Sequence, residues 1–204
     1  MPFHVYDPAA GHRLAHDPLN AIVAPRPIGW IGSRDAEGRA NLAPYSFFNL
    51  FNYKPPILGF CSLGWKDSVR NVAETGVFTW NLCTEDLAEA MNASSAAVPP
   101  ETDEFALAGL TAVAGETVAA PRVGESPVSF ECRLTQLLRL TDVAGAEIDA
   151  WLALGQAVRI HIDERLLIDG VFDTAAARPL LRGGGAADYF TISAAAKRVM
   201  HRPG

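Results

Sequence analysis

Apolar residues fall in short runs along this chain, and turn-forming residues separate the runs. Short runs bounded by Gly, Pro and Asp are typical of strands. A hairpin is predicted at Asp35–Gly38, because Gly38 can adopt the positive φ that a tight turn needs. Strands are expected over residues 28–34, 39–48, 57–63, 77–83, 128–140 and 152–162. Residues 166–172 are expected to close a hairpin onto the last of these strands across 163–165.

The apolar spacing changes to a helical period in a few places. Asp67 or Ser68 can cap a short helix that ends at Gly76, and a second helix is predicted over 84–92, with a shorter one near 103–108. Strands outnumber helices and do not alternate regularly with them, which disfavours a doubly wound parallel sheet. The pattern therefore predicts one antiparallel barrel with a few helices over its ends.

The chain divides into three parts by composition. Residues 1–17 are rich in Pro, Gly and His and are expected to form an N-terminal arm on the surface. Residues 18–190 hold the predicted strands and form the expected domain, and residues 191–204 form a C-terminal tail. No repeat, low-complexity tract or long polar linker divides the domain further.

The composition limits the classes of protein to which the chain can belong. Of its 204 residues 49% are hydrophobic and 20% are charged, which excludes a disordered or fibrous chain. The net charge of −6 argues against a broad phosphate-binding face, so no nucleic-acid partner is expected. No apolar run is long enough to span a bilayer and no signal-peptide pattern opens the chain. No membrane partner and a cytoplasmic location are therefore expected.

The potential metal ligands are scattered. Cys61, Cys83 and Cys132 lie in apolar, strand-like runs without metal-ligand spacing, so buried reduced thiols are predicted. The histidines of the N-terminal arm have no matching cluster nearby, so no metal site is expected. The phosphate-binding glycine motifs of dinucleotide and nucleotide folds are absent, as are the common hydrolase signatures.

The first segment with candidate chemistry is NLAPYSFFN, residues 41–49. Pro44 within a strand pattern implies an edge or a bulge, where main-chain groups lose their ladder partners. A flat heteroaromatic ligand could bond those groups and contact the neighbouring aromatic rings. An edge strand bonded to water, with its aromatic side chains in the core, has the same pattern. The residues alone leave both interpretations open.

The second segment is GWKDSVRN, residues 64–71. It places a lysine, a hydroxyl and a helix N-terminus close together. Free N–H groups of a first helical turn favour an anion, and Lys66 adds a full positive charge. An ordinary capped helix would look the same, so this segment by itself predicts either an anion site or a structural cap.

Several segments together resemble one family. The chain is similar to the flavin reductase-like, FMN-binding split-barrel family from about residue 18 to 190, through PRPIGWIGSRD, NLAPYSFFN, WKDSVRN with ETGVF, DEFALAGLT, PRVGESPVSFECRL and AVRIHIDERLLIDG. The resemblance implies a mainly β fold, an antiparallel Greek-key split barrel with a few peripheral helices. It also implies a homodimer that binds FMN near the subunit interface.

The resemblance further implies which residues hold the cofactor. The main chain of one segment would run along the isoalloxazine ring, and the hydroxyl of its serine would lie near the ring; its residues are Ala43, Pro44, Tyr45, Ser46 and Phe47. A second group would hold the phosphate or support the residues that do, and consists of Lys66, Asp67, Ser68 and Asn71.

Two further residues are candidates. Arg26 would lie on the phosphate or ribityl side of FMN. His161 matches a histidine on the family's late strand and would stand near the reactive face of the flavin as a catalytic group. A histidine hydrogen-bonded within the sheet is the alternative, and the sequence does not separate the two.

The main functional hypothesis is an oxidoreductase with bound FMN. It takes hydride from NADH or NADPH and passes electrons to free flavin, oxygen or a partner oxygenase. The absence of a dinucleotide fingerprint agrees with this, because the nicotinamide nucleotide needs to bind only transiently. The alternatives are a non-catalytic FMN carrier or sensor, and a split barrel that binds another cofactor such as haem.

Overall fold

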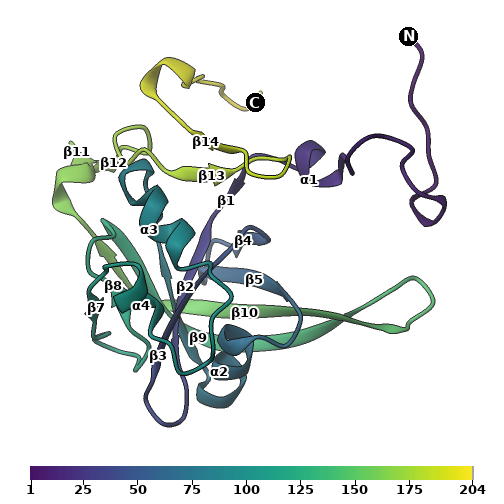
Figure 1. Ribbon diagram of the computed structural model, residues 1–204. Coiled ribbons are helices and arrows are strands. Elements are labelled where there is room, and N and C mark those ends of the chain that lie inside the picture. Colours follow the sequence, from purple (N-terminus) through teal and green to yellow (C-terminus); the bar gives the residue numbers. More distant parts are fainter. Residues whose placement is uncertain (204) are drawn as a thin grey trace.

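The computed structural model describes residues 1–203 of the chain. Its centre is a seven-stranded sheet in the order β3-β2-β6-β9-β10-β5-β4, shown in Figure 1, and every neighbouring pair is antiparallel. Its strands are β2 (Gly29–Arg34), β3 (Ala40–Tyr45), β4 (Phe48–Asn52), β5 (Ile57–Leu63), β6 (Val77–Asn81), β9 (Val128–Thr141) and β10 (Glu147–Ile162). The mainly β, Greek-key split barrel that the sequence predicts is confirmed.

A short bend in the chain connects the two edge strands of the curled sheet. β3 and β4 are the two edges of the sheet, yet they follow each other in the sequence and are joined only by Ser46 and Phe47. The sequence predicts a single strand over 39–48, whereas the structure bends it at this joint. Beyond the bend the carbonyl of Phe47 accepts a hydrogen bond from the N–H of Cys61, at 2.8 Å. The segment therefore leaves one neighbour, β2, and joins another, β5.

The core is divided into two apolar clusters. One fills the inside of the barrel and includes Phe60 and Phe78, whose rings meet edge to face. Gly155 is required here, because a Cβ atom at this position would lie 2.4 Å from the Phe78 ring. The other cluster, around Trp30 and Leu42, packs the opposite face of β2 and β3 against the helices. Both faces of these strands are thus buried, which leaves the free edge of β3 for a site.

The helices are short and peripheral. They are α1 (Leu19–Ile22), α2 (Asp67–Thr75), α3 (Ala88–Ala93) and α4 (Glu104–Leu107), with 3-10 turns η1 (Pro8–Ala10), η2 (Glu85–Leu87), η3 (Glu164–Leu166) and η4 (Ala194–Ala196). α2 ends at Gly76 in a left-handed conformation, as predicted. The helix predicted over 84–92 begins as the 3-10 turn η2 and continues as α3.

The remaining strands form small sheets at the periphery. They are β1 (Arg26–Pro27), β7 (Ala112–Val113), β8 (Arg122–Val123), β11 (Leu167–Ile168), β12 (Val171–Phe172), β13 (Leu180–Arg182) and β14 (Tyr189–Thr191). β13 lies between β1 and β14, so the end of the chain pairs with the entry to the domain. Figure 1 shows this sheet above the barrel, with the N-terminal arm extending away from it.

The hairpin predicted between residues 166–172 and the late strand is wrong. β11 pairs with β12 instead, and η3 separates both of them from β10. The turn of this local hairpin is made by Asp169 and Gly170, both at positive φ. Consecutive positive φ values are the requirement of a two-residue hairpin turn, and Asp-Gly is a favoured pair for it.

Two of the three thiols agree with the prediction of burial. Cys83 and Cys132 are free and buried, whereas Cys61 is free but only partly buried. Burial raises the pKa of Cys83 to about 12, so this thiol stays protonated and unreactive at neutral pH. Residues 1–203 hold no group of three potential metal ligands. Within the same range no helix is long and apolar enough to cross a membrane.

Candidate functional site

A polar pocket of about 430 Å³ opens where β3, the start of α2 and the segment 94–98 meet. It is lined by Asn41, Ala43, Pro44, Tyr45, Trp65, Lys66, Asp67, Ser68, Ser94, Ser95, Ala96, Ala97, Val98 and Glu104. Both segments singled out in the sequence, 41–49 and 64–71, therefore contribute to one cavity. We call it the α2 pocket.

The floor of the α2 pocket is a chain of buried hydrogen bonds. The amide nitrogen of Asn41 donates to the hydroxyls of Ser33 and Ser68, at 3.1 and 3.0 Å. The amide of Asn71 donates to the same Ser33 hydroxyl, at 3.3 Å. Asn71 does not line the pocket, but it supports the two side chains that do through Ser33. Asn71 can hold the pocket residues in place through these hydrogen bonds, which agrees with the supporting role predicted for it.

The start of α2 supplies the positive side of the pocket. Lys66 is the N-cap residue, and the first helical bond runs from the N–H of Arg70 to the Lys66 carbonyl, at 3.0 Å. The amides of the first turn are consequently without helical partners and can bond an anion. The Lys66 side chain is exposed, and no carboxylate within residues 1–203 forms an ion pair with it. This combination of charge and free amides suits a phosphate.

Asp67 has a different role from the predicted one. It is the first helical residue and does not cap α2 with its side chain. Its carboxylate instead forms an ion pair with Arg70, at 2.6 Å. The pairing neutralises a charge that would otherwise repel an anion at the helix start.

The edge strand β3 supplies the apolar side. Pro44 lies opposite Trp30 of β2 and has no N–H of its own to offer. Tyr45 packs against Phe60 with 4.8 Å between the ring centroids. Burial raises the pKa of the Tyr45 phenol, although the hydroxyls of Ser68 and Ser62 beside it act in the opposite direction. The phenol is therefore a neutral hydrogen-bonding group in the pocket wall.

Glu104 brings a carboxylate to the same pocket. It is the first residue of α4, and Asp103 caps that helix by accepting from two backbone amides. The Glu104 side chain is 7% exposed, and its Oε2 accepts from the N–H of Leu42 at 3.2 Å. Burial is the main cause that raises the pKa of Glu104, and Asp67 and Asp103 raise it further. The pocket thus has an acidic wall facing a basic helix start.

The segment 94–98 forms the remaining wall. The Ser94 hydroxyl accepts from the indole N–H of Trp30, at 3.0 Å, and donates to the carbonyl of Met91, at 2.8 Å. These bonds tie the segment to the end of α3 and to the core of the barrel. Sequence reasoning did not assign Asn41, Trp65, Glu104 or this segment to a site. Asn41 opens the NLAP motif and Glu104 lies in DEFALAGLT, so both were inside segments already marked by the resemblance.

The bend after β3 lies beside the pocket but outside its lining. The Ser46 carbonyl accepts from Arg26 Nε at 3.0 Å, and the Arg26 guanidinium also donates to the carbonyls of Asn20 and Val23. The guanidinium lies 5.6 Å from the centre of the Phe47 ring. Arg26 therefore braces the bend through main-chain carbonyls. Its predicted contact with phosphate or ribityl remains a prediction.

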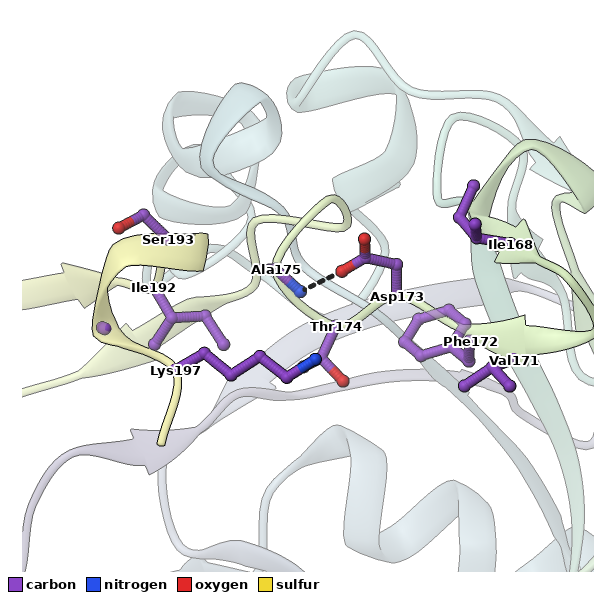
Figure 2. A pocket seen from close by; sticks show the side chains of 10 residues that line it. Ile168, Val171, Phe172, Asp173, Thr174, Ala175, Ile192, Ser193 and Lys197 are labelled. Carbon is purple, nitrogen blue, oxygen red and sulfur yellow. Dashed lines mark hydrogen bonds between the residues drawn. The ribbon is translucent and has the colours of Figure 1, made fainter. Parts of the chain in front are cut away.

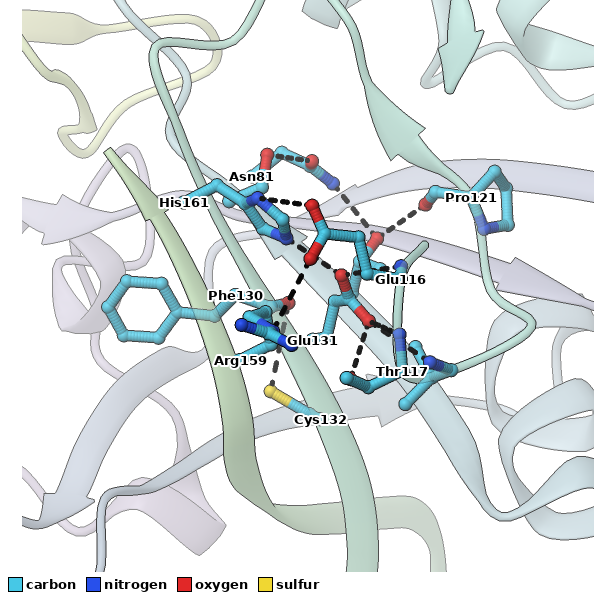
Figure 3. A network of polar contacts seen from close by, with 12 residues as sticks. Asn81, Glu116, Thr117, Pro121, Phe130, Glu131, Cys132, Arg159 and His161 are labelled. Atoms are coloured by element: carbon cyan, nitrogen blue, oxygen red, sulfur yellow. Dashed lines mark hydrogen bonds and ion pairs between the residues drawn. The ribbon is translucent and has the colours of Figure 1, made fainter. Parts of the chain in front are cut away.

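His161 lies in a separate polar network, drawn in Figure 3. Its Nε2 is 2.7 Å from Oε1 of Glu131, a carboxylate with no exposed surface. Glu131 also accepts from the N–H groups of Glu116, Thr117 and Val118, at 2.9, 2.6 and 3.0 Å, and from the Thr117 hydroxyl at 2.7 Å. None of these residues lines the α2 pocket. The geometry favours the alternative of a histidine bonded within the sheet.

The donors of this network decide the protonation state of Glu131. Burial alone raises the pKa of this carboxyl, but the Glu116 amide, the Thr117 hydroxyl and amide, and His161 outweigh it and lower the pKa to about 2. An ionised carboxylate only accepts hydrogen bonds, so Nε2 of His161 carries the proton. Its Nδ1 faces Glu116, whose carboxylate lies 3.9 Å away and also pairs with Arg159.

A second cavity lies near the C-terminal end of the chain. Figure 2 shows this pocket of about 440 Å³ between β12 and the turn at residues 192–197, with Phe172 and Ile192 among its lining side chains. It contains none of the residues predicted from the sequence. Its lining is mainly apolar, with Lys197 extended toward Thr174 across the opening. The α2 pocket has the denser set of polar groups and is the stronger candidate site.

Comparisons with known proteins agree on one family. A family model described as a flavin reductase like domain matches residues 23–180. An uncharacterised protein of Halalkalibacterium halodurans is 36% identical over 173 residues, which are 82% of each chain. Nitrilotriacetate monooxygenase component B from Bacillus cereus is 29% identical, with a TM-score of 0.81 over 90% of each chain. The 2-nitrobenzoate 2-nitroreductase of Pseudomonas fluorescens is 25% identical, with a TM-score of 0.77 over 91% of this chain and 88% of the other.

Proposed function

The chain belongs to the flavin reductase-like domain family, and we propose that it is an FMN-dependent oxidoreductase that takes hydride from NADH or NADPH. The observation that carries the proposal is the α2 pocket, which joins the predicted ring segment to the predicted phosphate residues. FMN has an aromatic ring, a hydroxylated chain and a phosphate with nearly two negative charges at neutral pH. The pocket offers a group for each.

The residues of the pocket fit the cofactor from one end to the other. Lys66 and the free amides of α2 suit the phosphate, because a cation and a helix start both attract an anion. The polar side chains of Asn41 and Ser68 line the floor of the pocket, where hydroxyls of the ligand can meet them. The backbone of Ala43–Phe47 lies along an edge strand with a bend, so its main-chain groups can bond the ring. FMN would supply the hydride-accepting atom, its N5.

A dimer forms part of the proposal. Apolar side chains are exposed on β4 and at the end of the same segment, where Leu50, Phe51 and Tyr53 are 49%, 56% and 76% exposed. Exposed apolar side chains gathered on one short segment are typical of an interface. We infer that a second copy of this chain covers it beside the bend, and sedimentation showing only monomer at micromolar concentration would contradict this.

The electrons would leave to free flavin, oxygen or a partner oxygenase. The likeness to a protein named as component B of a monooxygenase supports the oxygenase as an acceptor. The free thiols support a cytoplasmic location, since reducing compartments keep cysteines unpaired.

Two measurements test the proposal. The absorbance spectrum of freshly purified protein should show flavin bands, and a colourless protein that takes up no FMN would contradict it. Anaerobic stopped-flow mixing with NADH and with NADPH should then bleach those bands with at least one donor. Flavin that binds but stays oxidised with both donors would replace the proposal with an FMN carrier or sensor. A Soret band would indicate haem.

A further inference from the structure

We propose that Glu104 determines the ligand specificity of the α2 pocket, by accepting a hydrogen bond from a hydroxyl of the ribityl chain. This inference rests on the proposed function and adds a residue to its site. Glu104 lies in one of the segments that carry the resemblance, but the sequence assigned no role to it. The inference follows from the position of Glu104 and from the partners that its carboxylate lacks.

The carboxylate has unused capacity. A carboxylate has about four acceptor sites. Within the described part of the chain, the partners of this one are the backbone amides of Leu42 and of Glu104 itself, and no cation pairs with it. The carboxylate also lines the α2 pocket, so a hydrogen-bond donor on a ligand can reach its free acceptor sites.

The position of Glu104 selects the part of the ligand that it meets. Leu42, whose amide it holds, directly precedes the ring segment that begins at Ala43. Asp67, at the start of α2, lines the same pocket. Glu104 therefore lies next to the start of the predicted ring segment and shares the pocket with the predicted phosphate residues. The ribityl chain links the ring and the phosphate, and its hydroxyls are neutral donors.

The charges of the pocket determine the orientation in which the ligand binds. A phosphate next to Glu104 would meet a carboxylate in a partly buried site, which is repulsive. Lys66 and the free amides of α2, which belong to the same pocket, attract the phosphate instead. The two charges together favour only one orientation, with hydroxyls toward Glu104 and phosphate toward α2. An uncharged capping group at position 104 would hold the Leu42 amide equally well but would lose this selection.

The test compares three flavins on the same variants. Lumiflavin carries the ring alone, riboflavin adds the ribityl chain, and FMN adds the phosphate. Each is titrated by fluorescence into the full-length wild type, Glu104→Gln, and the control Glu101→Gln, which removes the same charge from an exposed position nearby. In Glu104→Gln the amide oxygen can keep the Leu42 bond, so the fold is preserved.

Riboflavin should bind about 5- to 10-fold more weakly to Glu104→Gln, because a neutral amide replaces a charged acceptor. The affinity for FMN should fall less than the affinity for riboflavin, because the substitution also removes the repulsion between the carboxylate and the phosphate. Lumiflavin should bind as to the wild type, which also shows that the pocket is folded. Equal losses for lumiflavin and riboflavin, or no loss for either, would overturn the inference. A wild type that binds no flavin would instead overturn the proposed function.

Discussion

Two buried carboxylates of this protein have opposite properties, although both come from the same residue type. Glu131, on β9, receives hydrogen bonds from three backbone amides, a hydroxyl and His161, and its pKa falls to about 2. Glu104, on α4, has only backbone amides as partners among residues 1–203, and its pKa rises. Burial penalises both charges, so the number of donors decides the outcome.

Because they differ in their number of donors, Glu131 has a structural role and Glu104 is available to bind a ligand. Glu131 has its donors inside the protein and fastens the segment 116–118 to the sheet, which leaves no capacity for a ligand. Glu104 still has free acceptor sites, and they face a cavity. The surroundings differ in the same way. The donors around Glu131 are all bound to it, whereas the α2 pocket contains free amides and Lys66, which has no ion-pair partner in the described part of the chain.

The largest effect is expected from Glu131→Gln. The amide keeps the shape of the side chain but presents N–H groups to donors that had an ionised acceptor. A pKa lowered from 4.5 to about 2 corresponds to roughly 3 kcal/mol of folding free energy, so a loss of about 2–4 kcal/mol is expected in urea unfolding at pH 7. Glu74→Gln, on the exposed face of α2, is the control and should change stability by less than about 0.5 kcal/mol.

The pH dependence gives this prediction a sign. Because the folded pKa of Glu131 is lowered, its contribution is complete above the unfolded value of 4.5 and is lost as the pH falls toward about 2. The stability difference between the wild type and Glu131→Gln should therefore shrink below about pH 4.5. A difference that stays constant down to pH 3 would mean that the charge of Glu131 does not contribute.

Next in size is Lys66→Ala, at the basic side of the α2 pocket. A charge-assisted hydrogen bond contributes about 1.5–3 kcal/mol, so FMN should bind roughly 10- to 150-fold more weakly. Riboflavin, which has no phosphate, should bind almost unchanged. Lys197→Ala removes the same charge far from this pocket and is the control. Equal losses for both flavins would place the phosphate elsewhere, with Arg26 as the next candidate.

A smaller effect is expected from Ser46→Ala, at the bend. Within residues 1–203 only the carbonyl of Ser46 is engaged by a side chain, and its hydroxyl has no partner. If that hydroxyl bonds the flavin ring, its loss should weaken FMN binding by about 0.5–1.5 kcal/mol. The reduction potential of bound FMN should shift too, since the strength of the bond changes with the charge on the ring. If both stay unchanged, Ser46 is structural.

The smallest effect is expected from Glu104→Gln on stability without ligand. A raised folded pKa means that the folded state holds the proton more tightly, so the stabilisation exists at acid pH and is lost as the pH rises. Removing the charge at pH 7 should consequently cost less than about 0.5 kcal/mol or should stabilise the chain. Urea unfolding of Glu104→Gln and Glu131→Gln under the same conditions compares the two carboxylates directly. If Glu104→Gln lost as much unfolding free energy as Glu131→Gln, the two carboxylates would not differ in their contribution to stability.

Local signals in the sequence predicted the fold well where one short segment determines the structure. The hairpin at Asp35–Gly38 and the end of α2 at Gly76 depend on residues within the turn itself, and both are confirmed. The pair Asp169 and Gly170 is an equally strong turn signal, and it places the hairpin turn within residues 166–172 and not at 163–165. The bend at Ser46 carries no such signal, because it results from pairing with β2 on one side and β5 on the other.

The site was predictable to the extent that its residues lie in two compact segments. Lys66 and Ser68 are close in the sequence, and the structure brings both to the pocket with Ala43–Tyr45. Glu104 meets Leu42 across a separation of 62 residues, so no local pattern contains that contact. The partners of His161 are also distant in the chain. The sequence therefore could not choose between its catalytic and structural roles, which depend on the fold.

The bond between Glu104 and Leu42 also has a consequence for solubility. β3 is an edge of the sheet, and an exposed edge can recruit a strand from another molecule and so begin aggregation. Here the Leu42 amide is occupied by a carboxylate, and Pro44 has no amide to give. A second strand would find neither donor, and it would meet a negative charge. The edge of β3 can therefore bind a small molecule, while pairing with a strand from another polypeptide is disfavoured.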